Sequence, residues 1–184
     1  MLRGFSSACS LLISQHFFLL VTYHLSLVTV FMAIELSLEN WKQIEQHGAE
    51  AYPNECCGML LGKEEDRRKI ILDILPLPNA RDDSPQNRFL ILPEDFVRGE
   101  REARSRGLEI LGFYHSHPDH FAQPSEFDRQ HAWPWYTYLI LGVNGGVPGA
   151  LTGWQLTEDR LQFLQEDLRV LGASPPAHRP EGQQ

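Results

Sequence analysis

Apolar and polar positions alternate along this chain in short blocks, and a regular pattern begins at residue 34. Ile34 and Leu36 flank the charged Glu35, an alternation that predicts a short first strand. The next apolar positions recur at helical spacing behind Ser37, a residue suited to an N-cap, so we expect a helix there that ends at Pro53. The face of this helix that we expect to be buried carries Trp41, Ile44, Gly48 and Ala51.

The remaining blocks predict a second helix and a series of strands. Pro93 at a helix start, acidic residues in the first turn and arginines in the last turn suit a helix dipole, and Gly107 marks the end. Residues 63–69 are all charged, and we expect a solvated hairpin turn there. The expected strands cover residues 55–62, 70–76, 108–114, 136–142, 151–156 and 161–170.

Length and charge narrow the class of protein. The chain has 184 residues, 42% hydrophobic and 22% charged, which suits one globular domain with a sizeable core. Its formal net charge is -8, and lysines and arginines are scattered rather than clustered. A nucleic-acid partner is therefore not expected, because phosphate backbones bind to basic stripes or patches.

The cysteines indicate a reducing compartment rather than a disulfide framework. There are three, and Cys56 and Cys57 are adjacent, an arrangement that rarely permits a relaxed bridge. A nucleophilic thiolate is a weaker interpretation, since neighbouring side chains on a strand point to opposite faces. We expect both thiols to pack in the interior.

The amino-terminal segment differs in kind from the rest. Residues 11–31 are apolar and uncharged and long enough to cross a membrane, but several polar residues dilute the run. A membrane anchor, a cleaved signal peptide and a start site assigned too early are the three interpretations. We favour translation from Met32, which predicts a cytoplasmic protein with a domain over residues 32–172. The composition of residues 173–184 predicts a disordered tail.

The strongest chemical signal is the segment YHSHPDHFAQPSEFD. His115 and His117 stand two residues apart at the end of an expected strand and point to the same side. Ser125 opens an expected helix, and Asp128 lies in its first turn, so its carboxylate returns towards the imidazoles. Two imidazoles and one carboxylate with a fourth position left for water are typical of a catalytic Zn2+ site.

Two other interpretations of this segment remain. Two surface histidines followed by a helix in which Ser125 and Asp128 form a capping box would need no metal. An alternative ligand set that includes His120, in the loop between the expected ligands, also has acceptable spacing.

This segment resembles the signature of the JAMM (MPN-plus) metallopeptidases, in which HSHP is followed by six residues, a serine, two residues and an aspartate. The resemblance covers roughly residues 34–170 and includes the stretch PNECCGMLLG, where Glu55 matches the family's additional glutamate. It implies an α/β fold of the cytidine-deaminase-like type, with a mixed sheet flanked by helices in a single domain. The alternating elements predicted above agree with that fold.

The resemblance also implies an activity. Glu55 would act as the general base that takes a proton from water and passes it to the leaving nitrogen, and Ser125 would help to stabilise the oxyanion. The bond would be the peptide or isopeptide bond after the carboxyl-terminal Gly-Gly of a ubiquitin-like or sulfur-carrier protein, as in single-domain bacterial members. The expected partner is the tail of that carrier. The oligomeric state does not follow from the sequence.

Other classes compete with this assignment. A nucleoside deaminase would need HxE and PCxxC elements, which the sequence lacks. A non-catalytic MPN-type scaffold and a RadC-like protein are the remaining alternatives. Residues 79–88 are a polar, turn-rich stretch that we interpret as either a substrate flap or an ordinary connecting loop. The indoles of Trp133, Trp135 and Trp154 are assigned no role.

Overall fold

The computed structural model describes residues 33–172. The expectations for residues 1–31 and 173–184 lie outside the described residues. Within residues 33–172, no helix combines the length and the apolar character that a membrane span requires.

Three helices and seven strands make up this part of the chain. The helices are α1 (Leu38–Ala51), α2 (Pro93–Ser105) and α3 (Glu126–His131). The strands are β1 (Ala33–Ser37), β2 (Cys57–Glu65), β3 (Arg68–Leu77), β4 (Glu109–Pro118), β5 (Thr137–Asn144), β6 (Val147–Leu156) and β7 (Phe163–Leu171).

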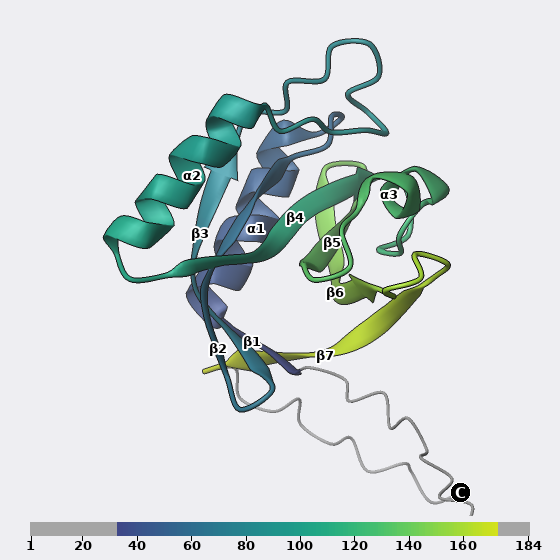
Figure 1. Ribbon diagram of the computed structural model, residues 1–184. Coiled ribbons are helices and arrows are strands. Elements are labelled where there is room, and N and C mark those ends of the chain that lie inside the picture. The colour runs from purple at the N-terminus through teal and green to yellow at the C-terminus, as the bar shows by residue number, and fades with distance from the viewer. Residues whose placement is uncertain (1–32, 173–184) are drawn as a thin grey trace, which may run out of the picture.

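The strands form one curled sheet that closes into a barrel in the order β1-β3-β2-β4-β5-β6-β7. The sheet is mixed, because β1 runs parallel to both β3 and β7 and β4 runs parallel to β5, whereas the other neighbours are antiparallel. The predicted α/β fold is thus confirmed, and closure of the sheet is a feature that the sequence pattern did not indicate. Figure 1 shows α2 outside the sheet and the loop between β3 and α2 rising above the end of β4.

Two hydrophobic clusters lie on the two faces of this sheet. On β2, Leu60 belongs to the cluster that packs against Ile44 of α1, whereas its neighbours Met59 and Leu61 belong to the cluster that packs against Ala103 of α2. This alternation follows from the two-residue period of a strand. The first helix matches expectation closely, since the Ser37 hydroxyl accepts a hydrogen bond from Asn40 N at 3.0 Å.

One expectation about the charged hairpin is wrong. The turn itself is only Asp66 and Arg67, and Lys69 lies inside β3 with 3% of its surface exposed. Its ammonium group donates a hydrogen bond to Thr137 Oγ1 at 2.7 Å and lies 3.7 Å from Glu166 Oε1. The barrel closes over this residue, and a buried charge of this kind needs such partners.

Candidate metal centre and active site

Strand β4 carries both histidines to one end of the barrel. It continues through His115 and His117 to Pro118, four residues beyond the apolar run that predicted it. The two side chains lie on the same face, and their Nε2 atoms are 3.1 Å apart. Parallel pairing with β5 holds this end of the strand, since His115 is opposite Ile140 and His117 is opposite Gly142.

Helix α3 returns the carboxylate of Asp128 to the histidines. Asp128 Oδ1 lies 3.5 Å from His115 Nε2, and Asp128 Oδ2 lies 3.5 Å from His117 Nε2. Ser125 is the N-cap, and the capping box considered from the sequence is present. The backbone N–H and the hydroxyl of Ser125 each donate a hydrogen bond to Asp128 Oδ2 at 2.7 Å. The cap therefore orients the carboxylate and is compatible with a metal site. Both histidines are buried, whereas the metal-free interpretation assumed that they lie on the surface.

The donor set fits a tetrahedral zinc ion. Ligand atoms about 2.0–2.1 Å from a tetrahedral ion lie about 3.3 Å from one another. The separations of 3.1 and 3.5 Å between the atoms of His115, His117 and Asp128 bracket that value. Within residues 33–172, these three residues form a cluster of potential metal ligands, and their ligand atoms all lie within 4.8 Å of one another. His120 is not part of this group, although it lies in the following loop.

Hydrogen bonding selects the tautomer that metal binding needs at one histidine. His117 Nδ1 lies 3.0 Å from the Phe121 carbonyl oxygen, to which it donates as an N–H. The lone pair of a neutral ring is then left on Nε2, where the other ligand atoms converge. Asp119 fixes the start of this loop, because it accepts hydrogen bonds from the Tyr52 hydroxyl and from Gly145 N, each at 2.9 Å.

Electrostatics also suit a metal site. Burial alone would raise the pKa of Asp128, but the two imidazoles and the Ser125 hydroxyl hold that pKa far below its usual range. Burial lowers the pKa of His115, which favours its neutral form in spite of the nearby carboxylate. A permanent carboxylate beside a neutral imidazole is the protonation state that a divalent cation binds.

Glu55 lies at the same end of the barrel. Cys57 pairs with His115 in the antiparallel ladder of β2 and β4, so the register brings the residue two positions earlier beside His117. Glu55 is 4% exposed, and it lines a polar hollow together with His117 and Ser125. Desolvation raises the pKa of Glu55 from 4.5 to about 8, with the charge of Asp128 adding to the rise and His117 opposing it.

The loop over residues 79–88 holds the backbone of Glu55. Glu55 N donates a hydrogen bond to the Pro85 carbonyl at 2.7 Å, and the Asn79 side-chain amide donates to the Glu55 carbonyl at 3.1 Å. The same Asn79 amide also donates to the Arg88 carbonyl at 3.1 Å. The loop is therefore a clamp for this residue, and its role as a substrate flap stays a prediction.

Two contributors were missed from the sequence. Asn79 was grouped with an irregular loop, and an asparagine opening a turn was the available signal. Phe89 stacks on the His115 ring, with the ring centroids 4.7 Å apart, and no local pattern connected these two residues. The cysteines pack as expected: both are buried and free, and desolvation raises the pKa of Cys56 to about 11.

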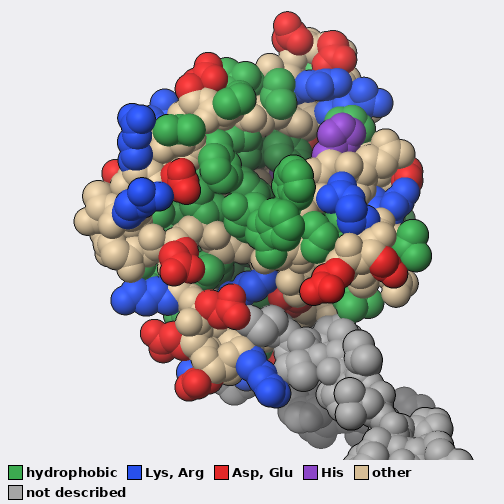
Figure 2. Space-filling model, viewed as in Figure 1, with side chains coloured by type: hydrophobic (Ala, Val, Ile, Leu, Met, Phe, Trp, Pro, Cys, Tyr) green, Lys and Arg blue, Asp and Glu red, His purple; other side chains and the backbone are tan. Residues whose placement is uncertain are grey.

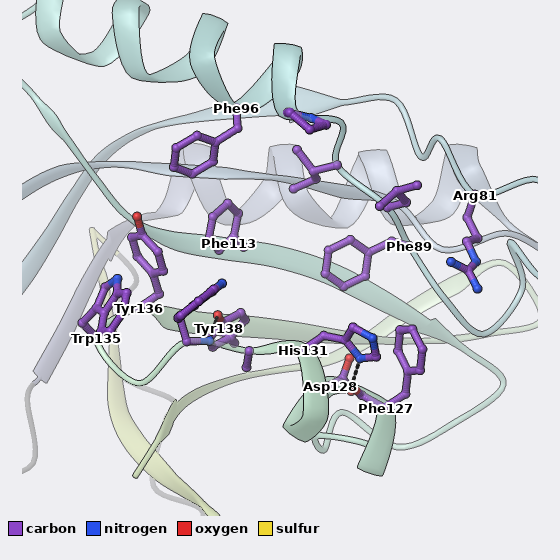
Figure 3. Close-up of a pocket in the computed structure, with 15 residues that line it drawn as sticks. Arg81, Phe89, Phe96, Phe113, Phe127, Asp128, His131, Trp135, Tyr136 and Tyr138 are labelled. Carbon is purple, nitrogen blue, oxygen red and sulfur yellow. Dashed lines mark hydrogen bonds between the residues drawn. The ribbon is translucent and has the colours of Figure 1, made fainter. Parts of the chain in front are cut away.

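An apolar groove also reaches the ligand set, through Asp128. It has a volume of about 500 Å³, and Asp128 and Phe89 line its end nearest the metal ligands. Figure 3 shows Phe127 and His131 at this end and Trp135 and Tyr136 at the opposite end. Trp133 and Trp135 line the groove and are 54% and 61% exposed, and the indole of Trp154 is not among the lining residues.

Comparison with known proteins identifies relatives of this chain. Desampylase from Haloferax volcanii is 36% identical over 113 residues, which are 61% of this chain and 76% of that protein. A probable TtuB-protein conjugate cleaving protease from Thermus thermophilus is 31% identical over 104 residues, which are 56% of this chain and 66% of that protein.

Solved structures share the fold. A solution structure of a Desulfitobacterium hafniense protein superposes with a TM-score of 0.67 at 27% identity and covers 80% of this chain and 99% of that one. A protein from Salinibacter ruber superposes with a TM-score of 0.59 at 35% identity and covers 81% of this chain and 96% of that one.

The family described as prokaryotic homologues of the JAB domain matches residues 38–157. The matched region includes Glu55 and the three candidate ligands. Among the described strands, it leaves out β1 and β7. The chain belongs to this family of prokaryotic JAB-domain homologues.

Proposed function

We propose that this protein is a zinc-dependent peptidase of the JAB type that hydrolyses the bond after the carboxyl-terminal Gly-Gly of a ubiquitin-like or sulfur-carrier protein. The observation that carries the proposal is the convergence of His115, His117 and Asp128 beside a buried glutamate. Family membership and the names of the two relatives support a hydrolase acting on conjugates of ubiquitin-like proteins.

His115, His117 and Asp128 would hold the ion. Zinc, when bound, supplies a Lewis acid that makes water acidic near neutral pH and polarises a carbonyl oxygen. Burial favours the neutral form of His115, and the hydrogen bond from His117 Nδ1 leaves Nε2 as the ligand atom of that ring when it is neutral. The Ser125 cap keeps the Asp128 carboxylate aimed at the same point. These residues thus need little rearrangement on binding.

Glu55 is the proposed base. Its carboxyl group lines the hollow that His117 also lines, and desolvation has raised its pKa to about 8. In its ionised form, the Glu55 carboxylate can accept a proton from the attacking water, and its raised pKa then suits it to give that proton to the departing amine. The amine therefore departs on the side of the polar hollow.

Ser125 is the proposed hydrogen-bond donor to the oxyanion, and the same side chain is the N-cap of α3. Its hydroxyl accepts a hydrogen bond from Asp128 N at 3.1 Å and donates to Asp128 Oδ2. Donation to an oxyanion requires the hydroxyl to rotate away from the carboxylate. Ser125→Ala would therefore affect both the cap and the reaction, and a loss of about 10²-fold in kcat is expected for a lost oxyanion donor.

The test combines metal content with turnover. Zinc-loaded protein is incubated with a Gly-Gly-tailed carrier joined through an amide to an amino acid, and release of the carrier is followed by mass spectrometry. Glu55→Gln should keep zinc and lose release, whereas Glu65→Gln, on the exposed hairpin of β2, should keep both. Stoichiometric zinc without any release would instead favour a non-catalytic scaffold, and protein that binds no zinc would refute the metal site.

A further inference from the structure

The apolar groove adjoins the reacting centre directly. Asp128 lines the groove and is also a candidate ligand, and Phe89 lines it while stacking on His115. A chain segment in the groove would therefore continue into the position of the scissile carbonyl. The groove and the polar hollow share no lining residue. If the amine departs by way of the polar hollow, as proposed above, the groove is left for the acyl part of the substrate.

The groove is large and aromatic. Figure 2 shows it as a hollow of apolar side chains, with basic side chains along its right-hand border. A mostly apolar pocket of this size with a few charged groups at its border is the usual form of a ligand-binding site. Its aromatic lining consists of Phe89, Phe96, Phe113, Phe127, Trp133, Trp135, Tyr136 and Tyr138.

Three guanidinium groups border these rings. Arg88 lies 4.6 Å from the centroid of the Phe127 ring and Arg81 lies 5.9 Å from it, while Arg160 lies 5.7 Å from the Trp133 ring. Among residues 33–172, neither Arg88 nor Arg160 has a carboxylate within ion-pair distance, whereas Arg81 is paired with Asp83.

Acidic side chains do not offset these cations along the groove. Asp128 is the acidic residue among the lining residues, and it faces the histidines. Glu126, next to Phe127 in sequence, is paired with Arg129 at 2.6 Å. The Arg160 guanidinium donates a hydrogen bond to the Gln130 carbonyl at 3.1 Å. Arg88 and Arg160 therefore border the groove as cations that have no carboxylate partner within residues 33–172 and could pair with acidic groups of a ligand.

Resting on the proposed function, we propose that the groove selects a carrier tail whose residues before Gly-Gly combine apolar side chains with acidic ones. The apolar side chains pack on the aromatic lining, and the carboxylates pair with Arg88 near the metal end and with Arg160 beside Trp133. A tail with arginines at the same positions is disfavoured by like-charge repulsion.

The test uses three synthetic tails, each amide-linked to the same lysine amine: Leu-Glu-Leu-Glu-Gly-Gly, Leu-Arg-Leu-Arg-Gly-Gly and Ser-Ser-Ser-Ser-Gly-Gly. We expect kcat/KM for the acidic tail to exceed that for the arginine tail by about tenfold at low salt, and less at high salt. The double variant Arg88→Glu/Arg160→Glu should reverse this order. Arg101→Glu, at an exposed position of α2, should leave it unchanged.

Binding of the same peptides to Glu55→Gln, measured by fluorescence anisotropy, separates this inference from the proposed function. A matching order of Kd values would support the groove assignment even if no peptide were cleaved. Equal kcat/KM and equal Kd for the acidic and arginine tails would overturn it, although cleavage of both would leave the peptidase assignment intact. A preference that survives the double charge reversal would also overturn it.

Discussion

The two hollows that reach the ligand set differ in volume and in the side chains that line them. The polar hollow has a volume of about 340 Å³ and is lined by Glu55 and the amide side chains of Gln86 and Asn87. The groove, at about 500 Å³, is lined mainly by aromatic rings. His117 faces the first and Asp128 the second, so each hollow reaches the candidate metal site through a different ligand. Under the proposed function, proton transfer belongs to the polar hollow and recognition of the tail to the groove.

This separation has a physical advantage. A titratable base needs partial desolvation with nearby polar groups, whereas recognition by aromatic packing needs a wide apolar surface. If the base and the apolar surface shared one hollow, the base would be buried completely or the apolar surface would be exposed to water. The following changes test the separation, and we describe them from the largest expected effect to the smallest.

Loss of the Asp128 ligand should abolish both zinc binding and turnover. Asp128→Ala removes a ligand and one partner of the Ser125 cap, so we expect zinc to be absent from the purified protein and turnover to fall to background. Metal analysis and the carrier-release assay measure the two effects. Asp167→Ala, on exposed β7, is the control. A variant that kept full activity would rule out Asp128 as a ligand.

A change in the polar hollow alone should affect chemistry without affecting recognition. Glu55→Gln should lower kcat by about 10²–10⁴-fold, the range expected for a lost general base, while KM and zinc content stay close to those of the unchanged protein. Steady-state kinetics at saturating zinc provide the measurement. A large rise in KM with kcat unchanged would show that Glu55 serves binding instead.

The raised pKa of Glu55 also predicts a pH dependence of stability in the metal-free protein. The side chain stays protonated in the fold up to about pH 8, whereas in the unfolded chain it ionises near 4.5. The free energy of unfolding should therefore fall between these pH values, by a few kcal/mol at most, and then level off. Urea unfolding in a chelator should reveal this decline, and Glu55→Gln should lack it. Parallel pH profiles for the two proteins would contradict the burial of Glu55.

A change in the groove alone should affect recognition without affecting chemistry. The double variant Trp133→Ala/Trp135→Ala removes two exposed, mutually packed rings whose centroids are 5.3 Å apart. We expect KM for the carrier to rise by about tenfold at nearly constant kcat, because the rings touch the tail and not the reacting bond. Leu72→Ala, an exposed apolar residue on β3, should change neither constant.

Local spacing explains which parts of this site the sequence could predict. The histidines follow one apolar strand, and Asp128 follows a cap residue, so their convergence depends on a short segment alone. Glu55 was identified only through the family resemblance, because its approach depends on the long-range register of β2 with β4. Nothing local to either segment encodes that register.

The groove illustrates the opposite case. Its rings come from the loop before α2, from α2 itself, from β4, from α3, from the segment between α3 and β5, and from the start of β5. Only tertiary packing brings them together. The exposed indoles were noticed in the sequence, but without a fold they could not be assigned to a surface. Closure of the barrel and burial of Lys69 were missed for the same reason. Closure depends on the pairing of β1 with both β3 and β7, and the burial of Lys69 depends on contacts with β5 and β7.

Helix α3 has six residues and none of them is buried, yet it supplies one of the three candidate ligands. Isolated helices of this length are unstable in water, so the capping box and the contact with the histidines must maintain it. Occupancy of the metal site and local order of α3 are then thermodynamically linked. A chelator should accelerate amide exchange in this single turn and a half long before it disturbs the barrel.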